Sequence, residues 1–454
     1  MWQLTIATQT HLRYNISEGL MKTIYLEKKY PNEQILGQFL DESHYDILIE
    51  EDCDVYKPLE HTVDAFGNEI QNGEHNLLLK FRKGVFSPEL VKMAYEGLRD
   101  AAGESQNRGI AAGPRTEKST GRDWVTALQE RLIDVLSGSM NTVTSDDPIA
   151  EAYAKAKTSE EVSTKGRVWL TLKRPAGFDF DAWVEKTAKL SYKDRLKEVE
   201  IINDWISDTS YANPVFSGIA GSYEKYPRIP YCRLTSYTSN HREVFSTAIP
   251  FIEKISEMFQ ELVPGRFEIQ KAAIAKVDPE YKIGNSVYST VTVNKNYRTA
   301  AHRDAGDFKE GFGNLTVTSN GKDWEGCYLV FPEYRAAVNV KPGDLLLAEL
   351  HSIHGNTEIS SPNNDHERIS IVCYMREKIV ECREKIYEDT RYNFIESRRK
   401  NSKHPLWYER WNGVSAGWDK SEEWYKYLVD NGLHEYASEI EEEVFGKKTA
   451  TLDI

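Results

Sequence analysis

The sequence predicts an α+β protein with a double-stranded β-helix, or jelly-roll, core that is flanked by helices and followed by a helical C-terminal extension. Seven short runs rich in Val, Thr, Ile, Leu and Tyr follow one another between residues 267 and 375, each bounded by Gly, Pro, Asn or Asp. Helical patterns precede these runs, and an aromatic-rich helical stretch follows residue 381. Many short strands packed on a helical layer are typical of a jelly roll.

Two segments before the strands carry helix signals. Ser87 and Pro88 form a typical helix start, an N-cap hydroxyl followed by proline in the first helical position, and apolar residues then recur at helical spacing over residues 90–101. Residues 249–262 form an amphipathic pattern in which Pro250 stands in the first turn. We expect both segments to belong to the helical layer that supports the strands.

The predicted strands lie in the second half of the chain. We expect them at residues 267–276, 286–294, 315–318, 327–331, 337–340, 344–350 and 369–375. With 454 residues the chain is longer than a typical single domain, so we divide it into three parts. These are a small, partly β N-terminal segment (1–75), a main domain (76–380) and the helical extension (381–454).

The charge of the chain is unevenly distributed. The net charge of −14 argues at first against nucleic acid as a partner. Residues 1–60 contain 5 basic and 11 acidic side chains, and residues 419–454 contain 4 and 10. Residues 281–322, by contrast, contain 6 basic and 3 acidic side chains. A local basic surface near the middle of the chain therefore stays open, although most charge runs are solvated faces.

Neither membrane nor disulfide signals are strong. No apolar run is long enough to span a bilayer, and the first residues lack the basic start and long apolar stretch of a signal peptide. The five cysteines are scattered and form no CxxC pair. We therefore expect reduced thiols in a cytoplasmic protein without a membrane partner.

The most informative segment contains His302-Arg-Asp304, which follows a predicted strand. Two residues apart in an extended chain, the imidazole and the carboxylate lie on the same side. Together they leave a metal site incomplete, since the facial triad of non-haem Fe(II) oxygenases needs two histidines and one carboxylate. A His-x-Asp triplet is weak evidence by itself, and its alternative is an ordinary pair of surface residues.

A second histidine is available where the strand at 344–350 ends. The chain continues there as His351-Ser-Ile-His354-Gly355, so either histidine could complete the triad. We favour His354, which is followed by glycine and lies ten residues after Asp344, and expect His351 to be a supporting or core residue. The metal ligands predicted in this way are His302, Asp304 and His354.

Arg368 opens the last predicted strand, fourteen residues after His354. A planar guanidinium beside the metal can hold one carboxylate of a dicarboxylic co-substrate by two parallel hydrogen bonds. In such a site the keto-acid group of 2-oxoglutarate binds the metal, and O2 is the second substrate. The ordered set of His-x-Asp, a strand ending in His-Gly and a following Arg is much more specific than any of its members.

Other residues near the triad are candidate contacts, each with a structural alternative. Asn294 and Asn296 could hydrogen-bond the co-substrate or substrate, or form a structural amide network. Asp307 could accept from an exocyclic amine, or cap a turn. The remaining candidates for substrate binding are Tyr297, Arg298, Phe308 and Phe312, whose alternatives are ordinary packing and solvation.

The segment 286–307, SVYSTVTVNKNYRTAAHRDAGD, followed by Gly311-Phe-Gly-Asn and Leu329-Val-Phe-Pro, resembles the TET/JBP dioxygenases, especially their phage-encoded and algal branches. The upstream stretches Asn107-Arg-Gly-Ile-Ala-Ala-Gly and Ser217-Gly-Ile-Ala-Gly are similar too. The resemblance spans roughly residues 76–380. It implies an Fe(II)- and 2-oxoglutarate-dependent enzyme that oxidises the 5-methyl group of a pyrimidine in DNA.

The resemblance also implies roles for residues of this chain. His302, Asp304 and His354 match the iron ligands, and Arg368 matches the arginine that binds 2-oxoglutarate. Family members act on 5-methylcytosine or thymine, and some relatives of the algal type take ascorbate as co-substrate. We rank 5-methylcytosine first and thymine second.

A methyl group inside a duplex cannot reach a buried iron, so the base must be flipped out or presented in single-stranded DNA. Such a substrate needs a basic rim and aromatic stacking surfaces. Candidates for the rim are Lys295, Arg298, Arg303, Lys322, Arg398–Lys400 and Lys403, and candidates for stacking are Tyr297, Phe308, Phe312 and Tyr334.

Two other functions stay open. The acidic balance favours the same oxygenase chemistry on a small metabolite, a free nucleotide or a protein side chain. A binding module that has kept the barrel and lost turnover is the third hypothesis, and the intact set of His302, Asp304, His354 and Arg368 argues against it. Oligomeric state cannot be predicted from these patterns.

Overall fold

The computed structural model describes the chain in two compact units. Described are residues 12–15, 21–30, 32–58, 73–74, 76–114, 213–226, 229–399 and 421–445, with short stretches between 161 and 208. The first unit comprises Met1–Pro114, Ala212–Glu224 and Arg233–Cys382, and the second comprises Arg115–Tyr211, Lys225–Cys232 and Arg383–Ile454. The first unit mixes helices and sheets, as predicted, and it carries the predicted metal ligands His302, Asp304 and His354 together with Arg368.

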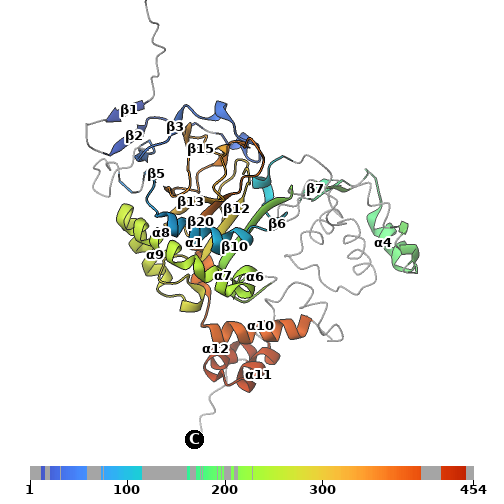
Figure 1. The fold of residues 1–454 in the computed structure, drawn as a ribbon. Coiled ribbons are helices and arrows are strands. Elements are labelled where there is room, and N and C mark those ends of the chain that lie inside the picture. Colours follow the sequence, from blue (N-terminus) through green and yellow to red (C-terminus); the bar gives the residue numbers. More distant parts are fainter. Residues whose placement is uncertain are drawn as a thin grey trace, which may run out of the picture. The chain divides into compact units, whose positions relative to one another are not determined.

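A large, mostly antiparallel sheet forms the body of the first unit (Figure 1). Its four central strands come from segments up to about eighty residues apart in sequence. In order across the sheet the strands are β1 (Leu12–Asn15), β2 (Lys22–Leu26), β4 (Cys53–Tyr56), β5 (Leu77–Arg82), β17 (Leu345–Ala348), β13 (Gly313–Ser319), β20 (Arg368–Tyr374), β12 (Thr290–Lys295), β10 (Val215–Tyr223) and β11 (Arg233–Leu234), with β6 (Glu104–Ser105) beside β10.

A smaller sheet packs against the large one. Its order is β18 (Gly355–Asn356), β15 (Leu329–Phe331), β16 (Ala336–Val338) and β3 (Ile47–Ile49). One hydrophobic cluster contains buried residues of both sheets, among them Phe81 and Leu346 from the large sheet and Phe331 and Val338 from the small one. The two sheets therefore share a core, and the N-terminal strands β2, β3 and β4 complete it.

Helices cover part of the large sheet (Figure 1). The longest is α8 (Ile249–Leu262), whose residues Phe251, Ile252, Ile255 and Phe259 are fully buried. Beside it lie α1 (Pro88–Leu98), α6 (Ser236–Asn240), α7 (Arg242–Thr247) and α9 (Pro264–Ile274). The hydroxyl of Thr318 on β13 donates to the carbonyl oxygen of Val91 on α1 at 3.0 Å, so α1 lies directly on the sheet.

Most predicted elements are present, and one prediction is wrong. Ser87 caps α1 by accepting a hydrogen bond from the N–H of Leu90, as its position predicts. Residues 267–276, predicted as a strand, instead form most of α9, which ends at Ile274, and the turn that follows it. Pro264 stands in the first turn of this helix, and the buried residues Phe267, Gln270 and Ile274 are spaced by three and four. That spacing is helical, although the apolar content of the segment suggested a strand.

The second unit contains the helical extension that the aromatic-rich C-terminal sequence predicts. Its helices are α10 (Lys385–Arg399), α11 (Glu422–Asp430) and α12 (His434–Phe445). They pack around the fully buried Trp424, Phe394 and Leu428. The unit also contains α4 (Phe180–Ala188) and the small sheet β7 (Glu161–Ser163), β8 (Leu170–Lys173) and β9 (Ile206–Asp208).

Two findings concern the whole described chain. None of its described helices is both long and apolar enough to cross a membrane. Cys232 and Cys382 are disulfide-bonded, so the expectation of five reduced thiols is wrong for these two. Cys53, Cys327 and Cys373 are buried free thiols.

Candidate active site

A short antiparallel pairing brings the two candidate histidines together. The backbone N–H of His302 donates to the carbonyl oxygen of His354 at 2.9 Å, and the reverse bond is also 2.9 Å. Gly355 permits this approach, because a Cβ there would lie 3.0 Å from backbone atoms of Ala300 and Ala301. As a result, the centroids of the two imidazole rings are 4.4 Å apart.

Asp304 lies beside both imidazoles. Its backbone N–H donates to the carbonyl oxygen of Leu350 at 3.1 Å, just beyond the end of β17. Its Oδ1 lies 3.3 Å from Nε2 of His302 and 3.8 Å from Nε2 of His354. One ligand atom from each of the three side chains lies within 4.8 Å of the others. Within the described part of the chain, this is the one group of His, Cys, Asp or Glu side chains that could hold a metal ion.

The hydrogen bonds of the histidines fit a metal-binding role. Nδ1 of His302 lies 2.8 Å from the carbonyl oxygen of Ala300, and Nδ1 of His354 lies 3.0 Å from that of Ser352. A carbonyl oxygen only accepts, so each Nδ1 carries the proton and each Nε2 directs a lone pair toward Asp304. Two lone pairs and a carboxylate oxygen that converge in this way suit a cation between them, either a proton or a metal ion.

The pKa directions describe the same competition. Burial disfavours protonation of His302, but the hydrogen bond and charge of Asp304 outweigh it and raise its pKa. Burial and the neighbouring His302 lower the pKa of His354 to about 4. Although burial opposes ionisation of Asp304, the imidazoles of His354 and His302 lower its pKa. These directions favour a proton shared by His302 and Asp304, and a metal ion would compete with that proton.

A cavity of about 320 Å³ opens beside the three side chains. All three line it, together with Arg368, and its size is at the lower end of ligand-binding pockets. Alternate residues of β20 and β12 face it, as a strand that presents one side to a cavity requires. The lining residues that the sequence analysis did not single out include Asn107, Arg108, Thr292, Ser370, Tyr374 and Arg376.

Arg368 has the features expected of an anion-binding residue. It is only 4% exposed, and its guanidinium carbon lies 5.2 Å from the ring centroid of Trp324. Among the described residues, no hydrogen-bond acceptor is found for its buried Nε. A buried cation with an unused donor at a cavity wall fits a carboxylate ligand.

The two predicted asparagines differ in position. Asn294 lines the cavity, and its Oδ1 accepts from the hydroxyl of Ser217. Asn296 does not line it. The Asn296 side chain accepts from the backbone N–H of Arg368 at 2.7 Å and donates to the carbonyl oxygen of His366 at 2.8 Å. For Asn296 the geometry thus matches the structural amide alternative, and the contacts hold the start of β20.

Asp307 and Tyr297 both line the cavity. Burial, together with the nearby charge of Asp304, raises the pKa of Asp307 to about 8. The hydroxyl of Tyr297 is buried and has no hydrogen-bond partner among the residues that the structure describes. Each therefore presents a polar group that a ligand could use.

Three predicted substrate contacts lie elsewhere. Arg298 donates to the carbonyl oxygen of Leu40 at 2.8 Å and does not line the main cavity. Phe308 and Phe312 line a second, very small cavity next to Asp307. Phe312 is buried under the guanidinium of Arg266, and the side chain of Phe308 is half-buried.

The predicted basic rim is largely neutralised. Lys295 lies 3.9 Å from Glu367, and Lys322 lies 3.6 Å from Asp365. The guanidinium of Arg303 contacts Glu333, and Tyr334 is only 5% exposed. Arg398 lies 3.0 Å from Glu423 within the second unit, whereas Lys400 and Lys403 lie outside the described residues. No unpaired basic rim therefore arises from the described candidates.

His351 has a different environment from His354. Its Nδ1 lies 2.9 Å from the carboxylate of Glu349, and its side chain is about one third exposed. The hydrogen bond that Glu349 accepts raises the pKa of His351. His351 therefore stands next to the site, as we expected, and does not belong to the group of three.

Comparison with known proteins agrees with this geometry. Residues 219–377 match the family model Tet_JBP, the oxygenase domain of the 2OGFeDO superfamily. Over 165 residues the chain is 38% identical to the bifunctional helicase and thymine dioxygenase JBP2 of Leishmania braziliensis, which covers 36% of this chain and 15% of that protein. Over 164 residues it is 37% identical to the thymine dioxygenase JBP1-B of Trypanosoma cruzi, covering 35% and 19%.

The solved structures are more distant. NgTET1 in complex with 5mC DNA aligns with 62% of this chain and 99% of its own, at 15% identity and a TM-score of 0.33. The chain spans less than a fifth of the length of the two curated relatives above. The resemblance noted in the sequence is nevertheless confirmed for the segment that carries the triad and Arg368. The similarity to the Tet_JBP oxygenase domain of the 2OGFeDO superfamily thus extends over residues 219–377 of this chain.

Proposed function

We propose that this chain is an Fe(II)- and 2-oxoglutarate-dependent dioxygenase that hydroxylates the 5-methyl group of a pyrimidine in DNA, with 5-methylcytosine as the first candidate and thymine as the second. The observation that carries the proposal is the convergence of His302, Asp304 and His354 in one cavity with the buried Arg368. Residues 219–377 match an oxygenase domain of the 2OGFeDO superfamily, and the curated relatives named above are thymine dioxygenases. The two sheets with their common core would be the double-stranded β-helix.

The donor set suits Fe(II). Two neutral imidazole nitrogens and one carboxylate on a single side leave further coordination positions for co-substrates. When bound, iron and 2-oxoglutarate supply the oxidising chemistry, in which O2 is consumed and 2-oxoglutarate becomes succinate and CO2. The protein contributes the backbone carbonyls of Ala300 and Ser352, which hold each imidazole in the metal-binding tautomer.

Arg368 favours 2-oxoglutarate over ascorbate as the co-substrate. Its guanidinium can form two parallel hydrogen bonds with a carboxylate, and Nε has no other partner among the described residues. Ascorbate has no carboxylate group for such a pair. Thr292, Asn294 and Ser370 add polar groups to the same wall and would orient the co-substrate.

The cavity volume of about 320 Å³ can hold a base but not a duplex. A pyrimidine would therefore enter flipped out of the helix or from single-stranded DNA. Asp307 and Tyr297 are the candidates for contacts with its polar edge. Ionised, Asp307 would accept from the exocyclic amine of 5-methylcytosine, and protonated it could donate to the O4 of thymine, so the residue is compatible with both bases.

A second candidate function rests on the paired cations. Lys295, Arg303 and Lys322 each face a carboxylate, which leaves little free positive charge for a DNA backbone. The same oxygenase chemistry on a free nucleotide, a small metabolite or a protein side chain would need no basic groove. The phage or algal type of the enzyme and a cytoplasmic location are further parts of the proposal.

The test is to incubate the purified chain with Fe(II), 2-oxoglutarate and one of four substrates: methylated duplex DNA, methylated single strands, unmethylated DNA or free nucleotides. We expect succinate release together with a new oxidised nucleoside, detected by mass spectrometry, from DNA. His302→Ala is the inactive control. Turnover of free nucleotides alone would favour the second candidate, and no succinate from any of the DNA substrates would contradict the proposed function.

A further inference from the structure

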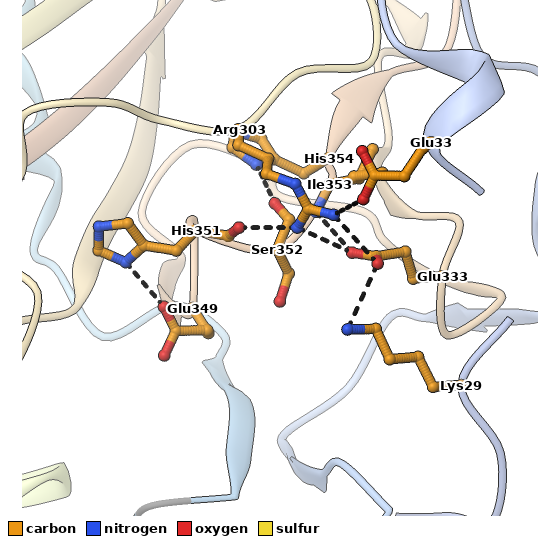
Figure 2. A network of polar contacts seen from close by, with 9 residues as sticks. All are labelled: Lys29, Glu33, Arg303, Glu333, Glu349, His351, Ser352, Ile353 and His354. Carbon is orange, nitrogen blue, oxygen red and sulfur yellow. Dashed lines mark hydrogen bonds and ion pairs between the residues drawn. The ribbon is translucent and has the colours of Figure 1, made fainter. Parts of the chain in front are cut away.

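Arg303 lies between His302 and Asp304 in the sequence. Its guanidinium belongs to a polar network with Glu33 and Glu333 (Figure 2). Its Nη1 donates to the carbonyl oxygen of His351 at 2.9 Å. The same Nη1 lies 3.2 Å from Oε2 of Glu333, and its Nη2 lies 3.3 Å from Oε1, so the two side chains form a bidentate pair. The segment that carries His302 and Asp304 is thereby connected to Glu333.

The same carboxylate also holds the segment that carries the third ligand. Oε2 of Glu333 accepts from the backbone N–H of Ile353 at 2.8 Å, one residue before His354. The Glu333 side chain is only 2% exposed. It belongs to the turn between β15 and β16, and none of its contacts is with a candidate ligand side chain itself.

Residues from the segment that connects β2 to β3 complete the network. Lys29 lies 3.5 Å from Oε1 of Glu333, and the N–H of Tyr30 donates to the Glu333 carbonyl oxygen at 2.8 Å. Glu33 accepts from Nη2 of Arg303 at 2.5 Å. A buried carboxylate needs such compensation, because an unpaired charge away from water is strongly unfavourable.

We propose that Glu333 is a positioning residue of the metal site, whose one buried carboxylate fixes the relative position of the two chain segments that carry the metal ligands. The inference rests on the proposed function, since it presumes that His302, Asp304 and His354 bind a metal ion. Through Arg303 the carboxylate restrains the first segment, and through the N–H of Ile353 it restrains the second.

Loss of the Glu333 carboxylate should act on metal binding rather than on the fold as a whole. The backbone bonds between His302 and His354 would remain, but the segments flanking them would lose their common anchor. A ligand set must be held within a few tenths of an ångström to bind a metal well. Residues that orient metal ligands typically account for about 10- to 100-fold in metal affinity.

The experiment uses the full chain and Co(II) as a spectroscopic probe under anaerobic conditions, so that no turnover is needed. Titration gives the dissociation constant, and the visible absorption bands report the ligand geometry. We expect Glu333→Gln to weaken Co(II) binding at least about tenfold and to change the bands. The matched control is Asp46→Asn. Asp46 accepts two hydrogen bonds, at 2.5 and 2.6 Å, from Arg335, which lies two residues after Glu333 in the same turn. This variant therefore removes one carboxylate charge from an arginine pair, as Glu333→Gln does. For it we expect less than a twofold change.

Urea unfolding separates a structural effect from a positioning effect. Should Glu333→Gln fail to fold, the double variant Arg303→Met with Glu333→Gln removes both partners and leaves no uncompensated buried charge. In that case the Co(II) affinity of the double variant is expected to fall at least about tenfold below that of the wild-type chain. If either folded variant kept the Co(II) affinity and absorption bands of the wild type, the positioning role of Glu333 would be overturned and the proposed function would not be affected. If the wild-type chain bound no more Co(II) than His302→Ala does, both the proposed function and the positioning role of Glu333 would be overturned.

Discussion

We call the triad of His302, Asp304 and His354 the fixed end of the cavity wall and Arg368 the open end. These two parts are built in different ways. Around the triad, polar atoms have protein partners: Nδ1 of His302 and of His354 each meets a carbonyl oxygen, and the intervening Arg303 meets a carboxylate. At Arg368 only the backbone is fixed, by Asn296, and the guanidinium rests on the ring of Trp324 with its Nε unpaired among the described residues.

The difference indicates what each part has to do. A metal ion is small and needs its ligands held in place before it arrives. The protein therefore provides a carbonyl acceptor for the Nδ1–H of each ligand histidine. A co-substrate carboxylate brings its own acceptors, so the donors of Arg368 must stay available until it binds. Stacking on Trp324 can orient a guanidinium without using those donors.

The largest expected effect comes from removing a ligand at the fixed end. His354→Ala should abolish tight metal binding, with a loss of activity beyond the roughly 100-fold that marks the upper end for residues that only support a ligand. Co(II) titration and succinate release measure the two effects. His351→Ala is the matched control, because its imidazole lies three residues away and contacts Glu349 instead of the group. A result in which His351→Ala loses the metal and His354→Ala keeps it would reverse our assignment.

The second prediction concerns the open end. Arg368→Lys keeps the positive charge but loses the bidentate geometry, worth about 1.5–3 kcal/mol for a charge-assisted hydrogen bond. The KM for 2-oxoglutarate should rise about 10- to 100-fold, whereas kcat at saturating 2-oxoglutarate and Co(II) affinity should change little. Steady-state kinetics with varied 2-oxoglutarate provides the measurement. If Co(II) affinity fell as much as the KM rose, the two ends would not be separable in the way we describe.

The difference between the two ends also explains how far the sequence could predict the site. Arg368 opens β20 as predicted, and the spacing of two between His302 and Asp304 and the glycine after His354 are readable locally. The three metal ligands lie in the connections after β12 and β17, where an isolated bridge joins His302 and His354. Ser370 and Tyr374 follow Arg368 at the same period and line the cavity as well, so the alternation on β20 contained a signal that the analysis did not use.

Other features depended on tertiary pairing that no local pattern contains. Glu333 is 30 residues from Arg303 and reaches it only because β15 and β16 pack beside the ligand segments. The charges of Lys295 and Lys322 were readable, but their partners Glu367 and Asp365 come from the approach to β20. The fold shows the same division: the strongly amphipathic α8 has the predicted limits, whereas the weakly patterned α9 was taken for a strand.

The third prediction sharpens the comparison through pH. The pKa of His302 is raised, because Asp304 outweighs the effect of burial, so the proton on this pair competes with a metal ion. Metal affinity should therefore fall as the pH is lowered through the pKa of His302, by up to about tenfold per pH unit for one displaced proton. Co(II) titrations between pH 8 and pH 6 test this. A metal affinity that is independent of pH would contradict the proton held between His302 and Asp304.

The smallest expected effect tests the stacking at the open end. Trp324 is 6% exposed and lies between the Nζ of Lys341, 3.7 Å from its ring centroid, and the guanidinium of Arg368 at 5.2 Å. Trp324→Phe keeps an aromatic face but weakens the cation–π attraction, which is strongest for tryptophan and amounts to about 0.5–2 kcal/mol in total. We expect the KM for 2-oxoglutarate to rise about two- to fivefold, with Co(II) affinity unchanged. Lys341→Met is the companion variant, since it removes the other cation from the same ring and leaves Arg368 in place. Should Lys341→Met raise the KM as much as Trp324→Phe does, the orientation of Arg368 would depend on the packing of the whole stack and not on its own contact with the ring.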